Sequence, residues 1–299
     1  MIVAGTIAAV VTPFTAGGAE VDLDLLDRHI AWLAEHGIRC IAPLGTNGEG
    51  PSLSLAERER VIEHLAGHPS GVALLPGTGC TSLPETIALS RLTVEHGAAG
   101  VLVPPPSYFP PERDGMLRWY ATLVEALPSH ARVFLYHIPR YTGVPVKVET
   151  VAALREAFGE RVAGVKDSGR DSAYSIELLD AVPGLVVLNG SDGSVAEGYR
   201  AGAHGVVSAL ANCVPEAVER VRAAVAAGGT GEAEQEALNP IRELTQRYPQ
   251  WAALKCLVHA VTGLPRSDVR PPLADLNDAE AVKLVEAFRA IPAPAGVLR

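Results

Sequence analysis

Eight short apolar runs, each followed by a turn and then by a longer segment with helical spacing, repeat along the first 210 residues of the chain. The runs are TIAAVVT (6–12), CIAPL (40–44), VALLPG (72–77), GVLVP (100–104), VFLYHI (133–138), VAGVK (162–166), VVLNG (186–190) and GVVSAL (205–210). They are apolar on both sides, which is typical of parallel strands covered on both faces. Strict alternation of such strands with helices indicates a parallel sheet.

The segments between the runs carry apolar residues at three- and four-residue steps, as at Leu26, Ile30 and Leu33, so each helix has one face to pack on a sheet. Two sequence pairs, Ser54 with Glu57 and Ser82 with Glu85, match the capping box that begins a helix. Eight such units predict an α/β fold, a closed (β/α)8 TIM barrel. An open, doubly wound sheet is the alternative.

The strand signal stops after about Gly228, and the rest of the chain is predicted to be helical over 232–247, 251–261 and 277–288. In the last of these, Ala281, Leu284, Val285 and Phe288 fall on one stripe, which must cover either the outer helices of the barrel or another subunit. We therefore predict a catalytic barrel at 1–227 and a C-terminal helical domain at 228–299.

The composition excludes several classes of protein. The chain has 299 residues, 48% of them hydrophobic, and a net charge of −9 without any basic cluster, so we expect a sizeable core and no nucleic-acid partner. No apolar stretch approaches the ~20 residues of a membrane span, and the N-terminus lacks a basic leader, so we expect no membrane partner and a cytoplasmic location. Cys40, Cys80, Cys213 and Cys256 are scattered, which predicts free thiols and no metal site.

Lys166 ends the sixth apolar run, directly before a polar turn. In TIM barrels the catalytic groups come from the C-terminal ends of the strands and the loops after them. An amine that is partly removed from water there loses some of its preference for the charged form, and an uncharged amine attacks carbonyls to form Schiff bases. The alternative is that Lys166 only neutralises a carboxylate such as Asp167.

Two more strand ends carry polar groups. Tyr136, near the end of the fifth run, is either a proton donor and acceptor for such chemistry or a core aromatic residue. GTNGEG (45–50) follows the second run, and its glycines, with Thr46 and Asn47, favour a nest for a carboxylate, or else a simple turn. It is not a phosphate-binding P-loop, because no Gly-Lys-Ser/Thr follows.

Three motifs, GTNGEG (45–50), YHIPRYTG (136–143) and GVKDSG (164–169), resemble those of the dihydrodipicolinate synthase and N-acetylneuraminate lyase family, the class I aldolases that handle pyruvate. The resemblance covers essentially the whole chain. It runs from GTIAAVVTPF through PPPSYFPP and LANCVPE to RPPLADL. Three motifs in this order are far more specific than any one of them.

The resemblance implies that Lys166 forms the Schiff base with pyruvate or a longer 2-oxo acid and that Tyr136 shuttles protons. It implies that Thr46 links Tyr136 to a second tyrosine from a neighbouring subunit, here Tyr108, and therefore that the protein is a homo-oligomer, a dimer or tetramer. Other positions that match the family's substrate pocket are Gly45, Asn47, Gly190 and Val207. No metal or cofactor is implied beyond the covalent bond to Lys166.

Departures from the pattern favour a lyase over a synthase. The carboxylate-binding arginine of the synthases aligns with Tyr141, whereas this chain has Arg140 one place earlier. Asp167 follows the lysine where the synthases usually have glutamate, and Asn47 replaces a second threonine. We therefore expect cleavage of a 2-oxo-4-hydroxy acid, of the 4-hydroxy-2-oxoglutarate or 2-keto-3-deoxy sugar acid type, into pyruvate and an aldehyde, with Arg140 a candidate for binding a distal carboxylate.

Two alternative functions stay open: a dihydrodipicolinate synthase that condenses pyruvate with aspartate semialdehyde, and a catalytically silent regulator that binds 2-oxo acids. Two further residues are ambiguous. His137 follows Tyr136 and is expected to point away from the barrel interior as a packed histidine. Glu49 is either a third proton-transfer group or an acidic residue before a helix.

Overall fold

A computed structural model describes residues 3–292 and contains one eight-stranded parallel sheet, in the order β3-β2-β1-β8-β7-β6-β5-β4. The strands are β1 (Gly5–Ala8), β2 (Cys40–Ile41), β3 (Ala73–Leu74), β4 (Val101–Val103), β5 (Val133–His137), β6 (Val162–Asp167), β7 (Val186–Asn189) and β8 (Gly205–Ser208). Between β3 and β4, Gly77 and Leu102 form a parallel bridge, and the Leu102 N–H donates to the carbonyl oxygen of Pro76 (2.8 Å). The sheet is closed, so the predicted (β/α)8 TIM barrel is confirmed and the open sheet is wrong.

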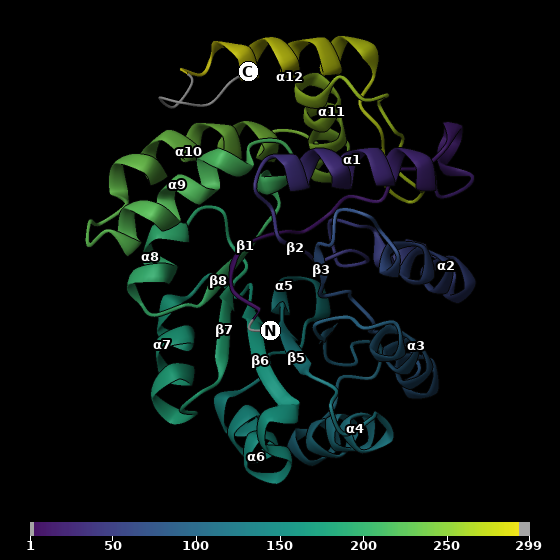
Figure 1. Cartoon of the computed structure of the whole chain (residues 1–299), viewed down its shortest axis with the longest axis vertical. Helices are drawn as coiled ribbons and strands as arrows, with labels where there is room; N and C mark the ends of the chain where they lie inside the picture. The colour runs from purple at the N-terminus through teal and green to yellow at the C-terminus, as the bar shows by residue number, and fades with distance from the viewer. Residues whose placement is uncertain (1–2, 293–299) are drawn as a thin grey trace.

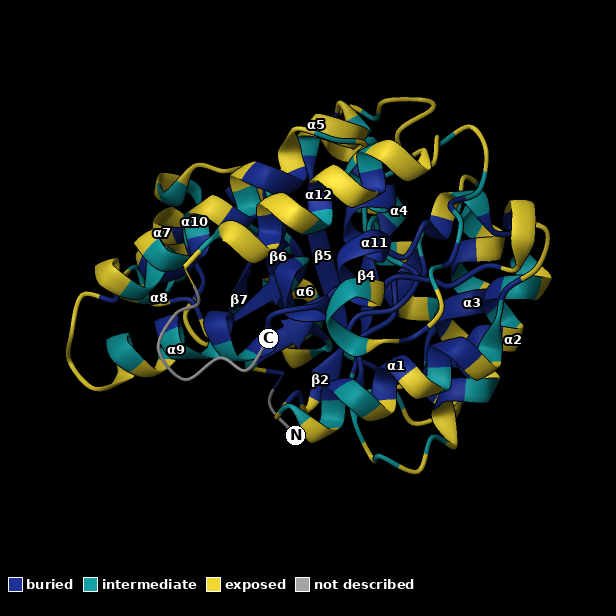
Figure 2. Ribbon diagram, turned by 90° about the horizontal axis from the view of Figure 1, so that it is seen from above, coloured by how far each residue is buried: buried dark blue, intermediate teal, exposed yellow. Residues whose placement is uncertain are grey.

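Helices surround the barrel (Figures 1 and 2). They are α1 (Leu23–Glu35), α2 (Leu55–Ala66), α3 (Leu83–Glu95), α4 (Arg113–Ala126), α6 (Val148–Phe158), α7 (Ser172–Ala181), α8 (Val195–Arg200) and α9 (Pro215–Ala226), with a short α5 (Pro139–Thr142) after β5. Ser54 and Glu57 form the predicted capping box of α2. Ser82 caps α3 by accepting from the Glu85 N–H, but the Glu85 carboxylate accepts from the Ser82 hydroxyl rather than from its backbone, so only half of the second box is present.

The core follows the apolar runs. Large apolar side chains such as Ile7, Leu75, Leu102, Phe134 and Leu188 fill the barrel interior, while the helices bury one face each against the outside of the strands. Figure 2 shows this as buried strands at the centre and helices that are exposed mainly on their outer faces. Every strand except β6 is shorter than its run, because the chain leaves the ladder while its side chains stay covered by the loops.

The C-terminal helices α10 (Glu232–Gln246), α11 (Gln250–Thr262) and α12 (Asp278–Ala290) agree with the predicted ranges. Ala281, Leu284 and Phe288 of α12 are buried in one cluster with α10 and α11, so the stripe covers the extension's own helices rather than those of the barrel (Figure 1). The same cluster includes Val206 of β8 and Val218 of α9.

The predicted boundary at residue 228 therefore crosses a shared core. It stays a prediction about folding units, and residues 1–2 and 293–299 of the two predicted domains lie outside the described residues.

All four cysteines are free thiols, as predicted. Over residues 3–292, no helix is both long and apolar enough to span a bilayer.

Candidate active site

Lys166 and Tyr136 lie side by side, because they are register partners on the adjacent parallel strands β6 and β5. The Lys166 Nζ donates to the Tyr136 hydroxyl at 3.0 Å and lies 4.2 Å from the centre of its ring. Each residue is only 5% exposed. An aromatic face attracts a cation, so the phenol orients the amine without neutralising it.

Asp167 does not pair with Lys166. Successive residues of a strand point to opposite faces, and the Asp167 carboxylate accepts from the Ser175 hydroxyl (2.7 Å) and the Gly169 N–H (2.8 Å). Within residues 3–292, the only lysine that forms an ion pair is Lys255, with Glu49. The alternative that Lys166 merely neutralises Asp167 is therefore wrong.

The phenol of Tyr136 has an unusual environment. Burial alone raises its pKa, but the charge of Lys166, together with hydrogen bonds to Thr46, Lys166 and Ser168, outweighs burial and leaves the pKa lower than usual. The Thr46 hydroxyl lies 3.3 Å from the phenol oxygen. Tyr136 can consequently release and recover a proton more readily than an ordinary buried tyrosine.

The turn after β2 brings Thr46 to this phenol. The backbone is left-handed at Leu44 (φ 59°) and Glu49 (φ 53°), and a Cβ at Gly50 would collide with the Leu44 carbonyl oxygen, so only glycine fits there. No acceptor within the described chain receives the N–H groups of Thr46 and Asn47. Two adjacent free donors of this kind suit an anion.

Helix α11 holds the turn from the C-terminal side. The Trp251 indole donates to the Thr46 carbonyl oxygen (2.7 Å), and the Gln250 side chain donates to Oδ1 of Asn47 (3.0 Å). These contacts join the start of the chain to its last quarter. The extension therefore helps to position Thr46.

Lys166 and Tyr136 open onto a cavity at the C-terminal ends of the strands. The other predicted site residues that line it are Thr46, Asn47, Arg140, Gly190 and Val207. A side chain at position 190 would collide with Oγ of Ser168 and with the Asp167 carbonyl oxygen, so glycine lets this part of the cavity wall pack closely against the loop after β6. Gly45 lies instead in an adjacent groove that shares Thr46 and Tyr136 with the cavity.

Tyr108 does not reach the cavity of its own chain. It lies in the proline-flanked loop after β4, where its side chain is 78% exposed and packs edge-on against Phe109 with the ring centres 5.0 Å apart. Phe109 is 81% exposed. The loop thus presents two aromatic rings away from the core of this chain.

Several cavity residues were missed by the sequence analysis. They are Ser168 and Arg170 in the loop after β6, Asp192 after β7, and Arg242, Thr245, Gln246, Gln250 and Leu254 from α10 and α11. The polar turn after Lys166 was a signal for the first two. Asp192 follows the seventh apolar run, so the same strand-end signal indicates it. No spacing indicates the residues of α10 and α11, because the sequence predicts only that the extension covers the barrel or meets another subunit.

His137 and Glu49 lie outside the cavity lining. The His137 Nδ1 accepts from the Val146 N–H (3.1 Å) and the ring stacks on Tyr174 with centres 4.2 Å apart, as expected of a packed histidine. The fully buried Glu49 carboxylate pairs with Lys255 and accepts from the Arg270 N–H (2.9 Å), so it neither faces the cavity nor serves as a simple helix charge. Within residues 3–292, no group of three or more His, Cys, Asp or Glu side chains could hold a metal ion.

Comparison with known proteins agrees with this arrangement. Residues 2–291 match the model of the dihydrodipicolinate synthetase family. The chain is 38% identical to an uncharacterized DapA-like lyase of Chloroflexus aurantiacus, over 97% of each chain, and 33% identical to a 4-hydroxy-tetrahydrodipicolinate synthase of Sorangium cellulosum, over 97% of this chain and 96% of the other.

Among solved structures, YagE of Escherichia coli K12 in complex with pyruvate superposes with a TM-score of 0.90 at 26% identity, covering 97% of this chain and 99% of that one. The KD(P)GA of T. tenax superposes with a TM-score of 0.86 at 28% identity, covering 95% and 98%. These matches span nearly the whole length and confirm the predicted resemblance. The chain belongs to the dihydrodipicolinate synthetase family.

Proposed function

We propose that the protein is a class I aldolase that cleaves a 2-oxo-4-hydroxy acid into pyruvate and an aldehyde through a Schiff base on Lys166. The observation that carries this proposal is the buried amine of Lys166, which faces an open cavity, lies 3.0 Å from the Tyr136 hydroxyl and has no carboxylate partner in the described part of the chain. The similarity to YagE, whose structure holds pyruvate, supports a 2-oxo acid as the ligand.

The reaction begins when the uncharged amine adds to the C2 carbonyl of the substrate. The resulting hydroxyl accepts a proton and leaves as water, which gives a positively charged imine. This imine draws the electrons of the C3–C4 bond as that bond breaks, while the C4 hydroxyl loses its proton and the aldehyde departs. The remaining enamine takes up a proton at C3, and water then releases pyruvate and restores the amine.

Tyr136 is the group placed to move these protons, since its hydroxyl contacts the amine and its pKa is lowered. Thr46 keeps the phenol in place. The free N–H groups of Thr46 and Asn47 support binding of the substrate's C1 carboxylate at this turn. Gly190 and Val207 line the part of the cavity where the carbon chain would lie. Gly45 belongs to the turn after β2 and lines the neighbouring groove.

Tyr108 fits the role of a residue given to a second copy of the chain. A 78% exposed tyrosine beside an 81% exposed phenylalanine is costly to leave in water, and insertion into a partner would bury both rings. The proposal thus includes a homo-oligomer in which Tyr108 of one subunit approaches Thr46 of another.

A synthase that condenses pyruvate with aspartate semialdehyde is the second candidate. The Sorangium cellulosum relative supports it, because that protein is a 4-hydroxy-tetrahydrodipicolinate synthase. Tyr141 in place of the expected arginine, Asp167 after the lysine and Asn47 in place of a threonine favour the lyase.

The test is borohydride reduction in the presence of pyruvate, followed by intact-mass spectrometry and peptide mapping. The chain has only four lysines, Lys147, Lys166, Lys255 and Lys283, so the modified position can be assigned cleanly. We expect one reduced pyruvyl adduct, on Lys166. No adduct on a folded protein would contradict the aldolase and favour a silent 2-oxo-acid binder. Turnover of 4-hydroxy-2-oxo acids, compared with condensation of pyruvate and aspartate semialdehyde, then separates lyase from synthase.

A further inference from the structure

The cavity around Lys166 is strongly basic, although the protein as a whole carries a net charge of −9. Four cationic side chains line it, Lys166, Arg140, Arg170 and Arg242, against a single carboxylate, Asp192. Such a concentration of one charge in a recess raises the local concentration of ligands with the opposite charge. Lys166 and the turn after β2 account for one end of a bound 2-oxo acid. At the other end only Arg140 has a predicted role, as a candidate for binding a distal carboxylate, and Arg170 and Arg242 join it in the cavity lining.

The arginines come from three separate parts of the fold. Arg140 lies in α5, Arg170 in the loop after β6, and Arg242 in α10. The backbone at Arg170 is left-handed (φ 67°), a conformation that is unfavourable for residues other than glycine. Strain of this kind persists where the surrounding structure imposes it, most often at ligand sites.

These three charges have weak partners among the described residues: Arg242 interacts electrostatically with the Asp192 carboxylate, and the Arg140 guanidinium carbon lies 5.4 Å from the centre of the Tyr141 ring. In the part of the chain that the structure describes, none of the three forms an ion pair with a carboxylate. The oxygens of Asp192 already accept from the Ser208 hydroxyl and from the N–H groups of Ala209 (3.1 Å) and Leu210 (3.2 Å).

The guanidinium groups also act on one another. Burial, and then the positive charges of Arg140 and Arg242, lower the pKa of Arg170. An anion placed between the guanidinium groups would offset this mutual repulsion.

We propose that Arg140, Arg170 and Arg242 form a subsite for an anionic group at the far end of the substrate, so that the aldehyde half carries a carboxylate or a phosphate. This inference rests on the proposed aldolase function. Guanidinium groups bind both anions through paired N–H donors. The neutral end of an unphosphorylated sugar acid would leave all three charges unpaired, and Gln246 and Gln250, which share the cavity mouth with Arg140 and Arg170, add amide donors.

The subsite is tested with substrates that differ only at the far end. In 4-hydroxy-2-oxoglutarate that end is a carboxylate, and in 4-hydroxy-2-oxopentanoate it is a methyl group. We expect the wild-type kcat/KM to be at least ~10-fold higher for the substrate with the carboxylate end than for the one with the methyl end. Arg170→Gln and Arg242→Gln should each lower this ratio of the two kcat/KM values by ~10-fold or more, mainly through a higher KM for the carboxylate substrate. Arg118→Gln, an exposed arginine on α4, is the matched control and should leave the ratio unchanged.

A phosphorylated 2-keto-3-deoxy sugar acid and its unphosphorylated form make a second pair, which shows whether phosphate or carboxylate is the better anion. Arg170→Lys retains the charge and should recover part of the ratio that Arg170→Gln loses. Equal wild-type kcat/KM values for substrates with charged and neutral ends would overturn the subsite. So would variants that lower kcat/KM equally for both substrates.

Failure of the aldolase proposal would be seen separately, as absence of a pyruvyl adduct on Lys166. The subsite can still be tested in that case by calorimetric titration of the wild type and Arg170→Gln with 2-oxoglutarate and 2-oxopentanoate, which need no turnover. We expect tighter wild-type binding of 2-oxoglutarate, and a preference that is reduced in the variant. Equal affinities of the wild type for the two acids would exclude the subsite.

Discussion

Lys166 on β6 and Lys255 on α11 are both buried lysines, but their surroundings differ. Their exposed fractions are 5% and 2%, and each amine lies over an aromatic ring, Tyr136 at 4.2 Å and Phe14 at 4.4 Å. The Lys255 amine pairs with Glu49 and donates to the Asp268 carbonyl oxygen (2.7 Å). Within residues 3–292, Lys166 donates only to the Tyr136 phenol. Both lysines are buried, so burial does not distinguish them. Lys166 is the candidate nucleophile because it lacks a counter-charge in the described chain and opens onto the cavity.

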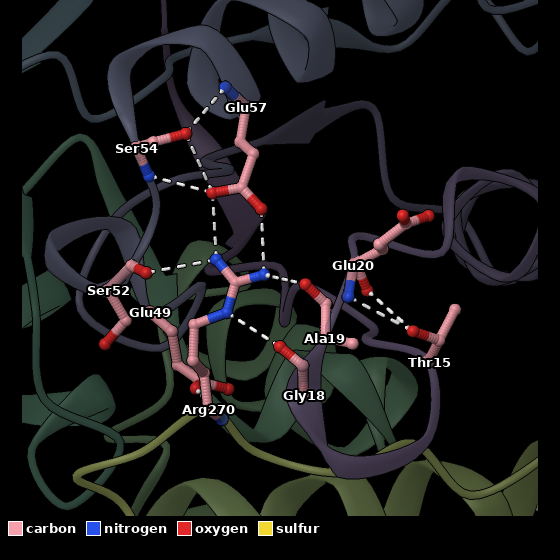
Figure 3. Close-up of polar contacts among 9 residues, drawn as sticks. All are labelled: Thr15, Gly18, Ala19, Glu20, Glu49, Ser52, Ser54, Glu57 and Arg270. Atoms are coloured by element: carbon pink, nitrogen blue, oxygen red, sulfur yellow. Dashed lines mark hydrogen bonds and ion pairs between the residues drawn. The ribbon is translucent and has the colours of Figure 1, made fainter.

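The surroundings of Lys255 have a structural purpose. Burial lowers the pKa of this lysine more than Glu49 raises it, but the ion pair remains the centre of a polar network. Arg270 extends it, since its N–H donates to Glu49 and its guanidinium makes two bonds to Glu57 (Figure 3). The network fastens the segment between α11 and α12 to the loop after β2, and so anchors the helical extension whose residues line the cavity.

The sharpest test of the comparison is Lys166→Ala. We expect it to abolish the pyruvyl adduct and to lower kcat by ~10³-fold or more, because no other amine replaces the nucleophile. Its thermal stability should equal or exceed that of the wild type, since the variant removes a buried amine that lacks a carboxylate partner. Full activity of this variant on every 2-oxo-4-hydroxy acid tried would contradict the assignment.

Lys255→Ala should have the opposite character. It leaves Glu49 buried without its counter-charge, and we expect a loss of ~3–5 kcal/mol in the free energy of unfolding, measured by urea denaturation. The double variant Lys255→Met with Glu49→Gln removes both charges and should be clearly more stable than Lys255→Ala. A single variant as stable as the wild type would show that the pair does not anchor the extension.

Thr46→Val tests the environment of Lys166 more finely, since valine keeps the shape and removes the hydroxyl. The hydrogen bond from Thr46 helps to lower the pKa of Tyr136, so its loss should raise that pKa. We expect the tyrosine limb of the pH–rate profile to move to higher pH and kcat to fall by about 10-fold. Thr122→Val, on the exposed face of α4, is the control; a limb that moves to lower pH would refute the reasoning.

Glu57→Gln probes the network around Lys255 with the smallest expected effect. Hydrogen bonds from Arg270, opposed by burial and aided by Ser54, lower the pKa of Glu57 from 4.5 to about 2. Because this pKa is lower in the folded state, the stabilisation is complete above pH 4.5 and disappears as the pH falls to about 2.

At pH 7 the variant should be less stable by about 1–3 kcal/mol. Urea unfolding at several pH values should show the two proteins converging in acid. A difference that stays constant down to pH 2 would contradict the assigned pKa.

The sequence was sufficient for much of the candidate site. Lys166, Tyr136 and Thr46 end or follow strands whose apolar runs are unmistakable, and in a closed parallel barrel all such ends meet at one rim. Their proximity followed once the strand count was right, and the hydrogen bonds at 3.0 Å and 3.3 Å agree with it. Strand boundaries were less accurate, because apolar residues beyond the ladder are buried by loops rather than by pairing.

The sequence by itself determined the barrel, its helical extension and the rim residues, because periodicity and turn chemistry act over a few residues at a time. Only the tertiary structure decided that α10 and α11 line the cavity, that Arg170 and Arg242 join Arg140, and that Glu49 pairs with Lys255 rather than facing substrate. Those contacts join residues far apart in the chain, and they depend on how one helix docks across a barrel. Spacing along the sequence does not encode the angle at which such a helix packs against the barrel, whereas the packed core fixes that angle.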